Sequence, residues 1–177
     1  DAARANVKHL TTLLAAKCAQ IGLSTAIEFT GNKGFHLWAF APDGAPARDL
    51  RRLGLWIVDS VEETDGEHAG LHVEVFPKQD TLDANDPYGN LVKVPLSRHK
   101  KTGNRCLFVD GEWKPYPDQI EHLAGVQTVT AAEIAGILEE WVPEEPETPK
   151  AAATTPGKGR LAKATREQGI TVVATGE

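Results

Sequence analysis

The chain is poor in features that would place it in several specialised classes of protein. It has 177 residues, no methionine and two cysteines, Cys18 and Cys106. The cysteines lie far apart in apolar settings, so we expect buried free thiols of a cytoplasmic protein, and neither a disulfide nor a zinc site. Because an initiator methionine is missing, we expect an excised or processed segment of something longer.

Long apolar runs are also missing. The longest, Leu53–Val58, is interrupted by Gly54 and is far too short to span a bilayer. The first residues are polar and helical in pattern, so they predict no signal peptide. The sequence therefore predicts a protein with no membrane partner.

The chain has no excess of positive charge. It carries 19 Lys and Arg against 25 Asp and Glu, for a net charge of -6. Net acidity opposes non-specific binding to phosphate backbones, which argues against a simple nucleic-acid coat protein. It leaves open an enzyme that touches nucleic acid locally and holds metal ions through carboxylates.

The composition divides the chain in two. Residues 1–142 carry periodic patterning and all four tryptophans, and a chain of this length holds one core of ordinary size. Residues 143–177 begin with a segment rich in Pro, Ala and charge, which predicts a linker. The short strand-like run Ile170–Ala174 then belongs to, or leads into, a further domain.

Within the first part, hydrophobic spacing predicts alternating helices and strands. The expected helices span 2–21, 46–62, 117–124 and 130–141, and the expected strands span 24–30, 35–41, 71–76, 91–95 and 105–110. In the strand at 35–41, His36, Trp38 and Phe40 face one way and the residues between them face the other. The fold class is α+β, a mostly antiparallel sheet with helices packed on one face.

Two segments carry candidate chemistry. The run Thr30–His36 places Lys33 and backbone N–H groups in a turn between two glycines, just before a histidine on a strand. Such a turn can meet phosphate, but a lone strand histidine is often structural. Glu74 lies on a half-buried strand, where a carboxylate is costly unless it binds a cation. The alternative for Glu74 is a solvated face, and Lys78 reads more simply as a surface lysine.

A basic loop, Arg98–Gly103, includes His99 and two lysines. Its functional interpretation is a clamp for a template strand or a triphosphate. Its ordinary interpretation is a solvated loop.

Several segments together resemble the second motif and later motifs of the archaeo-eukaryotic primases, in the primase-polymerase branch found in conflict systems and CRISPR-associated proteins. The first is Glu28–Trp38, which contains the pattern Ser/Thr-Gly-x-x-Gly-x-His. The others follow in the same order at Val73–Asp80, Tyr88–Leu96, Leu107–Asp110 and Pro115–Gln119. Any one of them would be weak evidence, and the shared order is what makes the resemblance specific.

The resemblance implies an RRM-like sheet with an added αβ module. It also implies DNA primase or polymerase activity, in which two divalent metals, Mg²⁺ or Mn²⁺, assist template-directed nucleotidyl transfer from NTPs or dNTPs. The matching positions make Glu74 the third metal-binding carboxylate and His36 the nucleotide-binding histidine. Further nucleotide contacts are expected from residues in and after the turns: Thr30, Lys33, Lys78, Lys93 and His99.

The family's Asp-x-Asp pair should end a strand just before the first helix, where this chain has only Asp1. Either Asp1 is the last member of this pair, or the pair lies wholly upstream. On the first alternative we assign Asp1, with Glu74, to metal binding and catalysis. We expect the isolated chain to bind nucleotide poorly and polymerise little. The expected partners are nucleoside triphosphates, single-stranded DNA or a primer-template, and a fused helicase or other nucleic-acid enzyme of a mobile element.

Two other functions stay open. One is a nucleotide- or nucleic-acid-binding module that has lost catalysis within a larger replication or defence protein. The other is a metal-dependent hydrolase that uses His36, Glu74 and a second histidine, His72 or His99, although these spacings fit no compact ligand signature.

Overall fold

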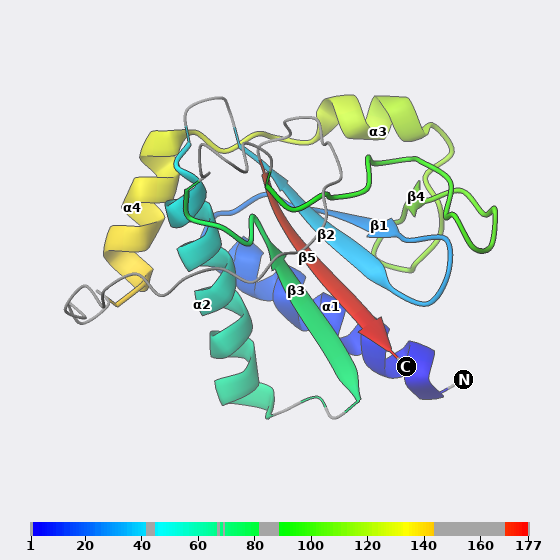
Figure 1. The fold of residues 1–177 in the computed structure, drawn as a ribbon, viewed down its shortest axis with the longest axis horizontal. Coiled ribbons are helices and arrows are strands. Elements are labelled where there is room, and N and C mark those ends of the chain that lie inside the picture. The colour runs from blue at the N-terminus through cyan, green and yellow to red at the C-terminus, as the bar shows by residue number, and fades with distance from the viewer. Residues whose placement is uncertain are drawn as a thin grey trace, which may run out of the picture.

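The computed structural model describes residues 2–41, 45–66, 68, 70–81, 89–143 and 169–176, so Asp1 lies outside the described residues. The helices are α1 (Ala2–Gln20), α2 (Ala47–Asp65), α3 (Gln119–Gly125) and α4 (Ala131–Trp141). The strands are β1 (Ala26–Phe29), β2 (Phe35–Phe40), β3 (Leu71–Phe76), β4 (Leu107–Phe108) and β5 (Gly169–Gly176). Figure 1 shows these elements arranged around one sheet.

The sheet has the strand order β3-β5-β2-β1-β4, and all of its neighbouring strands are antiparallel. β1 and β2 form the expected hairpin, with Glu28 opposite His36. The fold class is therefore α+β, as the sequence predicts. None of the helices in the described part of the chain is long and apolar enough to cross a membrane.

The helices α1 and α2 cover one face of the sheet. Each has a buried stripe with helical spacing, such as Leu10 and Leu14 in α1 and Leu53 and Ile57 in α2. These side chains share a core with Phe35, Leu37 and Ala39 of β2, and α4 joins the same core through Ile134 and Leu138. The predicted alternation in β2 is confirmed, because Trp38 and Phe40 belong to a separate cluster.

That second cluster lies on the opposite face of the sheet. Ala26, Trp38 and Phe108 are buried there under residues from the 92–96 segment and from the region of α3. The helix α3 begins where Asp118 accepts hydrogen bonds from the N–H groups of Ile120 and Glu121. This face is therefore covered by short segments and one small helix, in contrast to the two long helices of the first face.

The prediction of a strand at 91–95 is wrong. Residues 91–94 have no regular structure, because the segment crosses a face of the sheet and bonds to side chains and to a strand's carbonyl. Lys93 donates to the Thr30 carbonyl, and the Leu96 N–H donates to the Glu28 carboxylate. Pro95 has no N–H to offer a neighbouring strand. The strand expected at 105–110 is also shorter, since only Leu107 and Phe108 form β4.

The run expected to belong to or lead into a further domain lies in this sheet. β5 pairs with β2 on one side and with β3 on the other, so Val173 is opposite both His36 and Glu74. The run Ile170–Ala174 is a strand, as expected, but its place in this sheet was not predicted, because its pairing partners lie far back in the sequence, where local pattern gives no signal. The linker predicted from residue 143 falls largely on 144–168, outside the described residues, and a further domain beyond it stays a prediction.

Candidate functional site

One row of paired residues crosses the sheet. It runs from Glu74 on β3 through Val173 on β5 and His36 on β2 to Glu28 on β1. Directly paired residues share a face, so Glu74, His36 and Glu28 all lie on the face opposite α1 and α2. Neighbouring strands are about 4.8 Å apart, which places Glu74 and His36 about 10 Å apart. The sheet therefore brings together the two residues that the sequence singled out most strongly.

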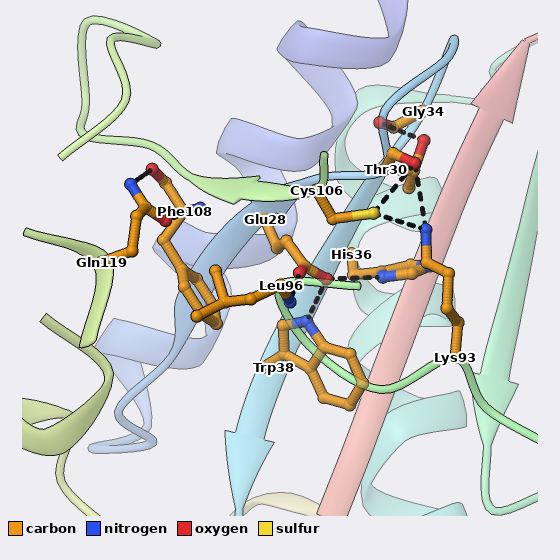
Figure 2. Close-up of polar contacts among 10 residues, drawn as sticks. All are labelled: Glu28, Thr30, Gly34, His36, Trp38, Lys93, Leu96, Cys106, Phe108 and Gln119. Carbon is orange, nitrogen blue, oxygen red and sulfur yellow. Dashed lines mark hydrogen bonds and ion pairs between the residues drawn. The ribbon is translucent and has the colours of Figure 1, made fainter. Parts of the chain in front are cut away.

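Glu28 is the centre of a buried hydrogen-bond network (Figure 2). Its side chain is fully buried, and its Oε2 lies 3.0 Å from His36 Nδ1 and 3.0 Å from Trp38 Nε1. Its Oε1 accepts from the Leu96 N–H at 2.6 Å. A buried carboxylate is costly unless donors surround it, and here three donors do so. His36 itself is 7 % exposed, and its Nε2 has no hydrogen-bond partner among the described residues.

A second polar group lies at the end of β1. Thr30 closes the Gly31–Gly34 turn, because its hydroxyl and its N–H both donate to the Gly34 carbonyl at 3.0 Å. The Thr30 carbonyl accepts from Lys93 Nζ at 3.0 Å and from Cys106 Sγ at 3.2 Å, and Lys93 Nζ also lies 2.8 Å from that sulfur (Figure 2). Thr30 thus shapes the turn, and Lys93 is fixed beside it, with one ammonium N–H that bonds to none of the described residues.

The turn at 31–34 is docked against the basic loop. The Gly31 carbonyl accepts from Thr102 Oγ1 at 2.8 Å and from Asn104 Nδ2 at 3.0 Å. His99 Nδ1 accepts from the Thr102 N–H at 3.3 Å, which holds its ring within the loop. Gly31 has φ of 84°, and a Cβ there would meet His99 Cβ at 2.8 Å. Only glycine fits this close approach, and His99 shapes the loop.

These two turns carry a group of exposed cations, which we call the cationic pad: Lys33, Arg98, Lys100, Lys101 and Arg105. None of them forms an ion pair within the described part of the chain. In a protein of net charge -6, the pad is a local positive surface. It is therefore the described surface best suited to a polyanion.

Glu74 lies apart from the buried network, toward the edge of the sheet. Its Oε1 accepts from Lys78 Nζ at 2.5 Å and lies 3.5 Å from His72 Nε2. The hydrogen bond from Lys78 lowers the pKa of the Glu74 carboxyl, and His72 lowers it further. Glu74 is therefore ionised near neutral pH, and in this structure its charge is paired with that of Lys78. The two interpretations of Lys78 from the sequence, a phosphate contact and a surface lysine, stay predictions.

The described residues do not form a complete metal site. No group of three His, Cys, Asp or Glu side chains converges anywhere in the described part of the chain. Mg²⁺ prefers carboxylate oxygens, and Glu74 is one such ligand. A single carboxylate does not hold two cations, and Asp1 lies outside the described residues. The hydrolase hypothesis finds no support here either, since His72 contacts Glu74 but His36 and His99 lie elsewhere.

Sequence reasoning missed the residues that organise the site. Glu28 stood inside the recognised motif but was not assigned a role, and Leu96 ended another of the motif segments, also without a role. A signal for Glu28 was present in the hairpin: a turn centred on Asn32, in which Thr30 is bonded to Gly34, places it opposite His36. No local signal marks Leu96 or Cys106, because their contacts join segments far apart in the chain.

An antiparallel sheet with long helices on one face and a histidine network on the other is consistent with the α+β core of an archaeo-eukaryotic primase. The family model for the archaeo-eukaryotic primase domain of the TOTE conflict system matches residues 1–137. The chain belongs to this family, which suggests a primase-like nucleotidyl transfer. Among curated proteins, none matches the chain.

Proposed function

We propose that this domain is the nucleotidyl-transferring part of a primase-polymerase that extends a nucleic-acid strand from nucleoside triphosphates on a single-stranded template. One observation carries the proposal: the pairing row places His36 and Glu74 about 10 Å apart on the face of the sheet that the long helices leave free. A triphosphate and its associated cation would lie along this row. The family match supports the same reaction class.

Each residue has a distinct task in this proposal. Nδ1 of His36 is already held by Glu28, so Nε2 is the nitrogen that faces the triphosphate. Because a phosphate oxygen only accepts, the ring carries a proton on both nitrogens when Nε2 binds it. Lys93 adds its remaining N–H beside the turn. Glu74 supplies one carboxylate toward Mg²⁺ or Mn²⁺. Glu28, the other carboxylate of the row, is fully buried and bonded to three partners, so a two-metal mechanism requires further ligands, with Asp1 the first candidate.

The cationic pad extends the proposal to the nucleic acid. Its side chains are exposed and lie on two turns that are bonded to each other through Gly31. A single-stranded backbone crossing the pad would pass close to Thr30 and Lys93, which lie at the same end of the sheet. We therefore assign the pad to the template or primer backbone.

The test measures nucleotide incorporation on primed and unprimed single-stranded DNA with Mg²⁺ or Mn²⁺, using the protein with any native residues that precede Asp1. We expect Glu74→Gln to abolish incorporation and His36→Ala to weaken it, mainly through a higher KM for nucleotide. Glu112→Gln is the matched control, because Glu112 also forms a 2.5 Å ion pair with a lysine, Lys114, away from the row. Unchanged incorporation in Glu74→Gln would refute the assignment.

A second function has an observation in its favour. The described residues contain no cluster of metal ligands, and Lys78 neutralises Glu74. A domain that binds nucleotide or single-stranded nucleic acid without catalysis would have these properties. Protein that binds both ligands yet incorporates nothing with either metal would favour this function.

A further inference from the structure

Glu28 is a buried carboxylate for which the proposed reaction has no direct use. It is the largest fully buried polar side chain among the described residues, and it lies directly across the hairpin from His36. Burying a charged carboxylate is costly, so the hydrogen bonds that surround it are expected to fix the positions of the groups that donate them. The three donors show which groups Glu28 holds in place.

Two of the donors have no alternative role. The Trp38 indole N–H and the Leu96 backbone N–H can only donate, and they occupy one position on each carboxylate oxygen. The contact with His36 is on the same Oε2 as the indole, at 3.0 Å. A carboxylate that accepts from its other partners also accepts from Nδ1, so the His36 proton lies on Nδ1. Nε2 then carries the lone pair in the free protein, and it takes up a proton when it donates to a phosphate oxygen, while Glu28 holds the proton on Nδ1.

The Leu96 donor also connects Glu28 to a second candidate site residue, Lys93. Leu96 has φ of 61°, an unusual conformation for a leucine, and its N–H bond to Glu28 holds it there. Three residues earlier, Lys93 is tied to Thr30 and Cys106. The segment carrying Lys93 is therefore fixed to β1 at two points, one of which is Glu28.

We propose that Glu28 is a positioning residue that sets the nucleotide site: it fixes the ring orientation and tautomer of His36 and anchors the segment that carries Lys93. This inference rests on the proposed function for its consequence, the binding of triphosphate. The orientation and tautomer of His36 in the free protein can be tested whether or not the proposed function is correct. Glu28 itself touches no substrate, since its side chain is fully buried.

The first measurement is the ¹⁵N spectrum of the His36 ring in the unaltered protein above pH 7.5. We expect the tautomer with the proton on Nδ1. The opposite tautomer, with the proton on Nε2, would overturn the proposal at once. Because it needs no variant and no activity, this measurement stands even where a Glu28 variant does not fold and where no nucleotide is incorporated.

The second measurement uses Glu28→Gln, which keeps the shape but replaces one oxygen with an amide donor. We expect the KM for nucleotide to rise about tenfold, the effect of losing one hydrogen bond of ordinary net strength, with kcat changed less. In a His36→Ala background the same substitution should change KM less than twofold. Equal effects in both backgrounds would mean that Glu28 supports only the fold, which refutes its action through His36.

The two proposals fail in different ways. A protein with the Nδ1–H tautomer but no incorporation would contradict the proposed function and leave the role of Glu28 toward His36 intact. Normal incorporation with an unchanged KM in Glu28→Gln would contradict the positioning role and leave the proposed function intact.

Discussion

At the scale of single residues, Gly31 determines whether the two turns fit together. Substitution to alanine adds a Cβ that would lie 2.8 Å from His99 Cβ and 3.0 Å from the Asn104 carbonyl oxygen, at a φ of 84°. The positive φ alone costs roughly 1–2 kcal/mol for an alanine, and the collision adds to that. We expect Gly31→Ala to lower the urea midpoint and to loosen the 98–105 loop.

Gly103 provides the matched control for that change. Its φ is 74°, but a Cβ there has nothing within 4 Å, so Gly103→Ala carries the conformational cost without the collision. The difference between the two variants measures the docking of the turns. Equal loss of stability in both variants would mean that the contact with His99 contributes nothing.

Cys18 is the residue whose ionisation differs most from its ordinary value. Burial against the core raises the pKa of its thiol from 9.0 to about 12. At pH 8 only about 1 in 10,000 of these thiols is ionised, so alkylation should be very slow in the native protein. Because the folded pKa lies above the unfolded one, this contribution to stability is complete below pH 9 and is lost as the pH rises toward 12.

Peptide mapping after iodoacetamide treatment at pH 8 checks this, with the denatured protein as the reference for full reactivity. Labelling of the Cys18 peptide at the same rate in native and denatured protein would show that α1 does not bury the thiol.

At the scale of elements, α3 is held by a histidine that has to stay neutral. The His122 ring stacks on Tyr116 with centroids 3.7 Å apart, and burial lowers its pKa below 6.5. The unfolded state then binds the proton more readily, so this contribution is present above pH 6.5 and is lost as the pH falls. We expect the amides of α3 to lose protection from hydrogen exchange between pH 7.5 and pH 5.

His122→Phe keeps a ring for stacking but cannot be protonated, so α3 in this variant should not respond to the same change of pH. The amides of α4 serve as an internal reference, since α4 contains no histidine. Acid sensitivity of α3 that survives in His122→Phe would place its origin in another group.

The helices and strands also show how much of the fold could be predicted from the sequence. The helices and the β1–β2 hairpin were predictable because their signals are local: a stripe such as Leu10 and Leu14, or glycines on both sides of a turn. The strand at 91–95 was mispredicted, and the place of β5 in the sheet was not predicted, because the environment of both segments is non-local. Strand propensity describes how well a segment fits a pleated, half-buried surface. The sequence of the segment does not show which strands will lie beside it.

The candidate site divides in the same way. His36 and Glu74 could be chosen as candidates from the sequence, since each stands in a motif. Neither motif shows that the two residues lie in one row across the sheet. It depends on β5, which joins the two strands through Val173. Glu28, the centre of the hydrogen-bond network, was not identified from the sequence. A glutamate in a short strand is expected to be solvated unless its hydrogen-bond donors are known.

At the scale of the whole molecule, charge is distributed unevenly. The net charge is -6, and the end of α2 carries exposed acidic residues such as Glu62 and Glu63, whereas the cationic pad has no acidic partner among the described residues. A single-stranded nucleic acid should therefore bind at the pad and be repelled elsewhere. Its affinity should fall steeply with salt, because bound phosphates release counterions.

The test is the salt dependence of binding to a single-stranded oligonucleotide, measured by fluorescence anisotropy. If Lys100 and Lys101 each contact one phosphate, replacing both with alanine should weaken binding and reduce the slope of log K against log salt by about 1.4, which is two contacts at about 0.7 each. The control replaces Arg48 and Lys114, two exposed cations outside the pad, each with a carboxylate partner. That variant should keep the original slope, because its lost charges face no phosphate. A slope reduced equally by both pairs would mean that the nucleic acid responds to overall charge, and the pad would then be an ordinary solvated surface.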